Sequence, residues 1–339
     1  MKELEQLVFR LCAAPGTPGG ELPAAKAAAA ELSKIAKVSI SRMGNLTAEF
    51  GDPGAKEHVL LDAHLDQIGL IVTGIDENGF LNVGRCGGAD ARVLPGTAVT
   101  VYGKETLCGV VCCTPPHLQE GGEDKVEPVD KMAVDVGLTR GTAEKLVRPG
   151  DRILFCTQPK RLLGARVSAA GLDDRAGVAA FVRCAQILSG EPLRCRVTVL
   201  CSTQEEVGGA GAKIGAFSAE PTQAVAVDVS FASQPGIPDV NLGKLGGGPM
   251  IGIAPVLDKK ITDSLIRLAE KKKMPWIREV MGGNTGTNSD EIATLGRGVP
   301  TGMVSIPLRY MHTPAEVVDL NDIENTAQLL AAYLREVGK

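Results

Sequence analysis

The 339-residue sequence has few aromatic side chains and no long apolar run, and it carries no excess of basic residues. Aromatic residues make up 3% of the chain, which argues against surfaces that stack nucleic-acid bases. No apolar run approaches the roughly 18 residues that a membrane helix needs. The net charge of −4 provides no basic surface for nucleic acid. We therefore expect a globular protein that binds neither nucleic acid nor membrane.

The nine cysteines lack the paired spacing of zinc ribbons and of disulfide frameworks. Most of them lie in apolar runs, where a thiol packs as a small hydrophobic group. We extend this interpretation to the adjacent Cys112 and Cys113. The first residues also lack the apolar core of a secretory signal. These features predict a reduced protein in the cytoplasm.

Helical and strand-like patterns alternate in two parts of the chain. Helical periodicity covers residues 3–13, 22–36, 175–189 and 261–273, and apolar strand-like runs cover residues 57–66, 195–206, 224–230 and 300–308. A last helix is expected over residues 321–337, with Asn321 as its N-terminal cap. Such alternation is typical of an α/β domain.

A different texture separates these two parts. From residue 70 to residue 163 the apolar runs are short, alternating and broken by Gly and Pro, which is typical of a small β-barrel or sandwich. Within this segment, residues 115–128 have the composition of a solvated loop. We therefore predict a catalytic α/β domain from residues 1–69 and 164–339, with a β-rich domain inserted at residues 70–163.

Imidazole and carboxylate groups recur at or just past the ends of the apolar runs. Five segments carry them, namely AHLD, LDDRAG, STQEEVGG, AVDVS and RYMHTPAE. Their candidate residues are His64, Asp173, Glu205, Glu206, Asp228 and His312. Two imidazoles and three carboxylates suit a pair of divalent cations, and one carboxylate is left to act as a base. The pattern therefore predicts metal-assisted hydrolysis.

Neighbouring acidic residues suggest further roles. Asp66 lies two positions after His64, so its carboxylate is predicted to orient the imidazole. Glu205 and Glu206 repel each other when desolvated, and a cation makes the pair tolerable. One of the two can bind metal while the other takes a proton from water. Taken alone, the glutamate pair also fits a solvated acidic loop, and Asp173 also fits a helix cap.

Several segments in this order resemble one known family. They are AHLDQIGLIV, GLDDRAGV, TQEEVGGAGA, AVAVDVS, LGKLGGGP and GVPTGMVSIPLRYMHTPAE. Together they resemble the tetrahedral aminopeptidases, which include the glutamyl aminopeptidases and belong to the two-metal zinc-peptidase-like exopeptidases. The resemblance covers nearly the whole chain. It implies a mixed-sheet α/β/α zinc-exopeptidase-like catalytic domain with an inserted small β-barrel domain.

The resemblance also assigns the metal ligands. It implies that Asp173 bridges two divalent ions per subunit, with zinc or cobalt as the expected metal. His64 and Asp228 complete one site in this assignment, and Glu206 and His312 complete the other.

The same resemblance implies how the site works. Glu205 is the general base toward a metal-bridging water, and Asp66 orients His64. The peptide between Asp173 and Asp174 resembles one that is cis in related enzymes. One departure is Gln67, since family members often have Glu at this position. The implied activity is removal of amino-terminal residues from peptides by a homo-oligomer, in which the inserted domain joins dimers into a dodecamer.

Three alternatives remain open at this stage. A deacylase or carboxypeptidase would use the same metal centre. A glycoside hydrolase of the endoglucanase type needs two facing carboxylates and no metal, and the few Trp and Tyr residues argue against it. A non-catalytic metal-binding or assembly protein would have no use for the additional Glu205.

Overall fold

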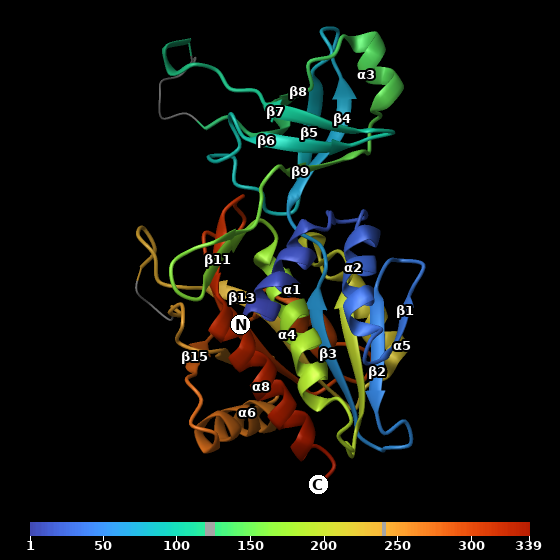
Figure 1. Ribbon diagram of the computed structural model, residues 1–339, viewed down its shortest axis with the longest axis vertical. Coiled ribbons are helices and arrows are strands. Elements are labelled where there is room, and N and C mark those ends of the chain that lie inside the picture. The colour runs from blue at the N-terminus through green and yellow to red at the C-terminus, as the bar shows by residue number, and fades with distance from the viewer. Residues whose placement is uncertain (119–125, 239–241) are drawn as a thin grey trace.

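The computed structural model describes residues 1–118, 126–238 and 242–339, and it consists of two parts (Figure 1). The larger part is a mixed sheet with helices on both faces, and the smaller part is a closed antiparallel barrel. Figure 1 places the barrel beyond one end of the large sheet, with both chain termini in the larger part. The predicted α/β/α domain with an inserted β-barrel is confirmed.

Within the described residues, the large sheet has eleven strands. Their order is β1-β2-β12-β3-β13-β16-β17-β11-β10, with β14 paired to β16 and β15 paired to β14. The central strands β12, β3, β13 and β16 are mutually parallel, and the outer pairings are mostly antiparallel. The strands are β1 (Lys37–Ile40), β2 (Leu46–Gly51), β3 (His58–His64), β10 (Lys160–Arg161), β11 (Arg166–Ala169), β12 (Arg196–Ser202), β13 (Gln223–Phe231), β14 (Met250–Ile253), β15 (Ile277–Val280), β16 (Thr301–Arg309) and β17 (Glu316–Asp319).

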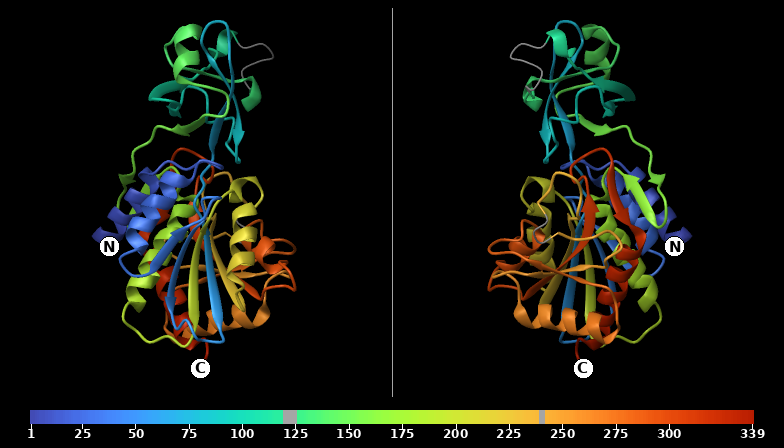
Figure 2. Two further views of the ribbon diagram at one scale, coloured as in Figure 1. Left: turned by 90° about the vertical axis from the view of Figure 1, so that its right-hand side faces the viewer. Right: turned by 90° about the vertical axis from the view of Figure 1, so that its left-hand side faces the viewer.

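Helices cover both faces of this sheet (Figure 2). The main apolar core joins one face to α1 (Lys2–Ala13), α2 (Leu22–Leu32), α4 (Leu172–Leu188), α6 (Lys259–Lys271) and α8 (Leu320–Glu336). A smaller core joins the other face to α5 (Ala210–Ala219) and α7 (Asn288–Ala293). Because both faces are covered, every residue of β3 is buried, as its nearly continuous apolar sequence requires.

The barrel closes in the order β4-β5-β8-β7-β6-β9. Its strands are β4 (Gly69–Ile75), β5 (Leu81–Cys86), β6 (Ala98–Tyr102), β7 (Thr106–Val111), β8 (Ala133–Asp135) and β9 (Arg152–Phe155), and α3 (Arg140–Leu146) precedes the last of them. Alternate residues such as Leu81 and Val83 point into an apolar core. Strand β10 lies within the segment predicted as the insertion, yet it pairs with β11 in the large sheet.

The structure corrects two local expectations. The cap of α8 is Asp319, whose carboxylate accepts a hydrogen bond from the amide of Asn321, so the prediction of Asn321 as the cap is wrong. All nine cysteines are free, but Cys113 is exposed and Cys112 is only half-buried, because the pair follows β7 at the rim of the barrel. The expected packing of this pair as small hydrophobic groups is therefore wrong.

Two other expectations concern the predicted loop and the absence of a membrane helix. Of the predicted loop at residues 115–128, residues 119–125 lie outside the described residues. Across the described ranges, none of the helices combines the length and the apolar character needed to span a membrane.

Candidate metal centre

The six candidate residues converge at one edge of the large sheet. His64 is the last residue of β3 and lies in register with Ser202, the last residue of β12. Because β3, β12 and β13 are parallel, their carboxyl ends meet at the same edge. The chain reaches Glu205 three residues after β12 ends. Asp228 belongs to β13, Asp173 lies in the first turn of α4, and His312 lies in the connection between β16 and β17.

Five of these side chains form two groups of three that share Asp173. One group contains His64, Asp173 and Asp228, and the other contains Asp173, Glu206 and His312. Within each group, the atoms that could bind a metal lie within 4.8 Å of one another. The first group is fully buried, whereas Glu206 and His312 of the second are half-buried. Glu205 belongs to neither group.

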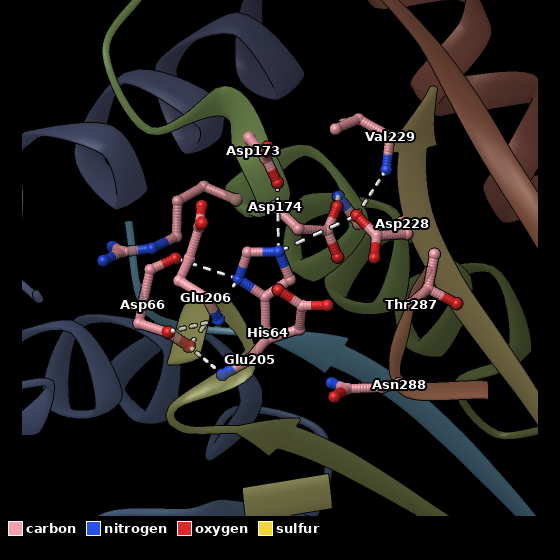
Figure 3. A network of polar contacts seen from close by, with 12 residues as sticks. His64, Asp66, Asp173, Asp174, Glu205, Glu206, Asp228, Val229, Thr287 and Asn288 are labelled. Atoms are coloured by element: carbon pink, nitrogen blue, oxygen red, sulfur yellow. Dashed lines mark hydrogen bonds and ion pairs between the residues drawn. The ribbon is translucent and has the colours of Figure 1, made fainter. Parts of the chain in front are cut away.

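The distances within the first group are short. Nε2 of His64 lies 3.0 Å from Oδ1 of Asp173 and 3.7 Å from Oδ1 of Asp228. Figure 3 shows these three side chains turned toward one another. The peptide between Asp173 and Asp174 is cis, as the resemblance implied.

The second group has a similar spacing around the other Asp173 oxygen. Nε2 of His312 lies 3.4 Å from Oδ2 of Asp173 and 3.5 Å from Oε2 of Glu206. The other carboxylate oxygen of Glu206 is buried without a hydrogen-bond partner. A buried orphan oxygen beside two other potential ligands fits a position that a cation completes.

The orientation of His64 comes from the main chain of Asp66 rather than from its carboxylate. Nδ1 of His64 lies 2.9 Å from the carbonyl oxygen of Asp66 and 3.7 Å from its Oδ1. This contact leaves Nε2 facing the carboxylates, which is the arrangement that a ligating histidine needs.

The carboxylate of Asp66 instead holds the loop that carries the two glutamates. Its Oδ1 accepts a hydrogen bond from the amide of Glu205 and its Oδ2 accepts one from the amide of Glu206, both at 3.0 Å. The preceding Gln204 has a left-handed backbone with φ of 60°, and its amide donates to Oε1 of Glu21 at 3.2 Å. The amide of Thr203 donates to the side chain of Asn45. Side chains therefore accept hydrogen bonds from four consecutive backbone amides of this loop, those of residues 203–206.

Another buried carboxylate joins the segments of Asp173 and His312. Oε2 of Glu316 accepts a hydrogen bond from the amide of Asp173 at 3.2 Å, and its Oε1 accepts one from the amide of His312 at 3.1 Å. Glu316 opens β17, in register with Ala169 of β11, and this places it beside the start of α4. Neither Glu316 nor Glu21 is assigned a role by the sequence patterns. Their isolated charges beside buried segments are the only signal that could have identified them.

The charges of the first group are strongly coupled. Burial acts to lower the pKa of His64, but hydrogen bonds to Asp173 and Asp228 raise that pKa well above its ordinary value. Burial acts to raise the pKa of Asp173, but hydrogen bonds from His312 and His64 hold that pKa below its ordinary value. A carboxylate held ionised between two imidazoles suits a shared metal ligand.

The pKa values of Glu205 and Glu206 shift in the opposite direction to that of Asp173. Burial and then the nearby charges of Asp228 and Glu206 raise the pKa of Glu205 to about 8, against the opposing charge of His64. Burial and then the charge of Asp173 raise the pKa of Glu206 to about 7. Both carboxyl groups therefore hold protons readily in the absence of cations.

A buried polar cluster lies beneath the first group. Nδ2 of Asn288 donates to Oδ2 of Asp62 at 2.9 Å and to the hydroxyl of Ser202 at 3.0 Å. Burial raises the pKa of Asp62 to about 7. This cluster attaches the start of α7 to the strands that carry the site.

The segment after β5 also reaches the site. A Cβ atom added at Gly87 would lie 3.0 Å from Oε2 of Glu206, and one added at Gly88 would collide with the ring of His312. The inserted part of the chain therefore packs its backbone directly against the second group.

Comparison with known proteins identifies the family of this site. Residues 44–329 match the sequence model of the M42 glutamyl aminopeptidases. The chain belongs to the M42 glutamyl aminopeptidase family. It is therefore a peptidase of the metal-dependent aminopeptidase type.

Individual relatives of this M42 peptidase cover nearly its whole length. A lysyl aminopeptidase from Pyrococcus furiosus is 32% identical, and the match covers 98% of this chain and 97% of that protein. An aminopeptidase structure from the archaeon Desulfurococcus kamchatkensis has a TM-score of 0.92 and 32% identity, covering 99% of this chain and 95% of that one. A structure of the Pyrococcus horikoshii TET1 peptidase, which can assemble into a tetrahedron or a large octahedral shell, has a TM-score of 0.88 and 32% identity. That match covers 98% of this chain and 100% of the other.

Proposed function

We propose that this M42 peptidase removes amino-terminal residues from peptides with two divalent metal ions and Glu205 as the general base. The observation that carries the proposal is the pair of three-residue groups that share Asp173 while Glu205 stays outside both. We assign His64, Asp173 and Asp228 to one ion and Asp173, Glu206 and His312 to the other. Imidazole and carboxylate ligands suit zinc or cobalt.

The ions would supply Lewis acidity, lowering the pKa of the attacking water and polarising the scissile carbonyl. Glu205 would accept a proton from that water while the water oxygen bonds to the carbonyl carbon. The same carboxyl group would then give the proton to the departing amine as the peptide bond breaks. The hydrogen bond from the Glu205 amide to Asp66 supports this role, because it holds the backbone of the base in place.

The family of the chain supports action at the amino terminus of the substrate. The matching model is that of the M42 glutamyl aminopeptidases, and the Pyrococcus furiosus relative is a lysyl aminopeptidase. We therefore favour an aminopeptidase over a carboxypeptidase on this centre.

The proposed role of Glu205 is tested with Glu205→Gln. We expect kcat/KM on amino-acyl chromogenic substrates to fall by about 10²- to 10⁴-fold, because the amide cannot take up the proton. The metal content should stay at about two ions per chain, because Glu205 is not an assigned ligand. Glu270→Gln, at an exposed position of α6, is the matched control. Full activity of Glu205→Gln would disprove the assignment.

The substrate class is tested with paired peptides. We expect cleavage of a peptide with a free amino terminus and none of its N-acetylated counterpart, in assays supplemented with zinc, cobalt or manganese. Equal cleavage of the two peptides would favour a carboxypeptidase instead, and processing of the N-acetylated peptide alone would favour a deacylase.

We also propose that the chain has two functional domains, residues 1–69 with 164–339 for catalysis and residues 70–163 for assembly into homo-oligomers. The assembly of the related TET1 peptidase supports this proposal. Val110 on β7 and Leu118 are exposed apolar side chains of the insertion, at 47% and 65% exposure. Sedimentation of Val110→Glu beside the wild type tests the proposal. Large particles of unchanged size from both proteins, and from a variant lacking residues 70–163, would contradict it.

A further inference from the structure

A group of buried carboxylates outside the two metal-binding groups hydrogen-bonds to the main chain of the loops that carry them. Glu316 is 1% exposed, and each of its oxygens accepts one amide, from Asp173 and from His312. Glu21 is 2% exposed and accepts the amides of Gly19 and Gln204. None of these four bonds belongs to a helix or a strand.

The segments that donate these amides have backbone conformations that need outside support. His312 has a left-handed backbone with φ of 61°, which L side chains rarely adopt, and Gln204 has φ of 60°. A non-glycine residue keeps such a conformation only when its surroundings determine it. The amide of each residue donates to a carboxylate of a neighbouring element, Glu316 at the start of β17 or Glu21 at the start of α2.

Glu316 connects the segments that carry Asp173 and His312. Asp173 belongs to both three-residue groups, and His312 belongs to the second. One carboxylate therefore links the start of α4 to the β16–β17 connection and sets the distance between them. This arrangement differs from a buried ion pair, because Glu316 takes its partners from the backbone of the segments rather than from their side chains.

We propose that Glu316 and Glu21 are positioning residues, which set the loops of the metal-binding side chains by accepting their backbone amides. Glu316 acts on Asp173 and His312, and Glu21 acts on the Glu205–Glu206 loop. The inference rests on the metal-binding roles proposed above. It predicts that the two residues respond differently to the same conservative replacement.

The difference follows from how their oxygens are used. Both amides at Glu21 reach the same atom, Oε1, so a glutamine can keep both bonds. The amides at Glu316 reach different oxygens, so a glutamine must present its own NH2 group to one of the two donors. A buried donor that faces another donor loses its bond and stays unsatisfied.

The test compares Glu316→Gln with Glu21→Gln in the full chain. Metal-depleted protein is titrated with Co²⁺ in a calorimeter. We expect Glu316→Gln to weaken Co²⁺ binding by about 10- to 100-fold, the usual cost of losing a group that orients metal ligands. Glu21→Gln should stay within about twofold of the wild type, and Glu21→Leu, which removes the acceptor, should lose about tenfold.

Glu31→Gln is the control for a merely structural effect. Glu31 is buried in α2 and pairs with Arg10 and Lys34, away from the metal-binding loops. We expect its loss to lower the melting temperature and to leave the Co²⁺ affinity unchanged. Amide hydrogen exchange adds a readout independent of metal, with faster exchange of residues 310–313 in Glu316→Gln and of residues 203–206 in Glu21→Leu. Global destabilisation would instead speed exchange throughout the chain.

The outcomes separate this inference from the proposed function. If the wild type binds no Co²⁺, the proposed function fails. If the wild type binds Co²⁺ and Glu316→Gln binds it equally well, the positioning role of Glu316 is wrong. If Glu316→Gln does not fold, Glu316→Asp replaces it, because it keeps both acceptor oxygens but withdraws them by one methylene. Wild-type affinity and exchange in Glu316→Asp would likewise overturn the role.

Discussion

The barrel and the large sheet bury different kinds of side chain. Among the described residues between Gly69 and Leu172, every buried side chain is apolar. The flanking parts of the chain bury His64, Asp173, Asp228 and many other polar groups. An apolar core tolerates exchanges of similar volume, whereas buried charges need partners at fixed distances. Folding and chemistry therefore place separate demands on the two parts of this chain.

The largest test of this difference is Asp173→Ala. One substitution removes a member of both proposed metal-binding groups, so we expect kcat/KM to fall by at least about 10³-fold, equivalent to about 4 kcal/mol. Metal analysis should show fewer than the wild-type number of ions per chain. An active, fully metal-loaded variant would show that the buried charges of the large sheet are not needed for the chemistry.

Matched Leu→Ala substitutions in the two cores should give the next largest effect, a loss of stability. Leu81 in the barrel and Leu61 in β3 are both 0% exposed. Each replacement by Ala should lower the free energy of unfolding by about 2–5 kcal/mol, measured by urea denaturation. We expect only Leu61→Ala to weaken metal binding, because Leu61 precedes His64 on the same strand. Loss of metal affinity in folded Leu81→Ala would show that the barrel core does determine the site.

The backbone contact between the insertion and the site allows a smaller test. An alanine Cβ at Gly88 would meet the ring of His312, so Gly88→Ala should displace this proposed ligand and lower kcat/KM by about 10- to 100-fold. Gly141→Ala is the control, since an added Cβ there meets nothing within 4 Å. Similar kinetics for both variants would limit the role of the insertion to assembly.

The smallest expected effect is the pH dependence of metal-free protein. The pKa values of Glu205, Glu206 and Asp62 are raised to about 8, 7 and 7, so the folded state keeps protons that the unfolded state releases. This stabilisation is complete below the unfolded pKa values near 4 and is lost as pH rises through 7 and 8. The pKa of His312, raised to about 9 first by its hydrogen bond to Asp173, acts in the same direction.

Thermal melts of chelator-treated protein at pH 5 and pH 8 measure this effect. We expect a lower melting temperature at pH 8 and recovery after addition of Zn²⁺, which favours deprotonated ligands. A melting temperature that rises from pH 5 to pH 8 without metal would contradict the sign. Asp173 opposes the trend only below its unfolded pKa near 4, because its folded pKa is lowered.

The sequence patterns predict the strands that lead to the candidate residues, because these strands have strong local signals. The apolar run ending at His64 and the run ending at Ser202 both form buried parallel strands. Residues at the carboxyl ends of such strands meet at one edge, so the candidate residues could be grouped before any contact was known. The cap of α8 was misplaced because Asp319 and Asn321 are both good capping residues two positions apart.

The remaining features have no local signal. Asp66 was expected to orient His64 through its carboxylate, but its backbone carbonyl makes that contact because β3 ends at His64 and the chain turns. Glu21 and Glu316 each accept one amide from a segment distant in the chain, and such bonds produce no periodic pattern. The approach of Gly88 to His312 likewise depends on how the insertion folds back.

Local patterns in the sequence are enough to predict the main helices and strands, the β-rich insertion that interrupts the chain, and the six candidate residues for the chemistry. These features follow from hydrophobic periodicity and from the residue types at strand ends, both of which are local. Only the tertiary structure decided that Asp173 is shared between two groups, that Glu205 belongs to neither, and that Glu316 joins two of the loops. Such relations depend on distances between segments far apart in the chain, and packing sets those distances.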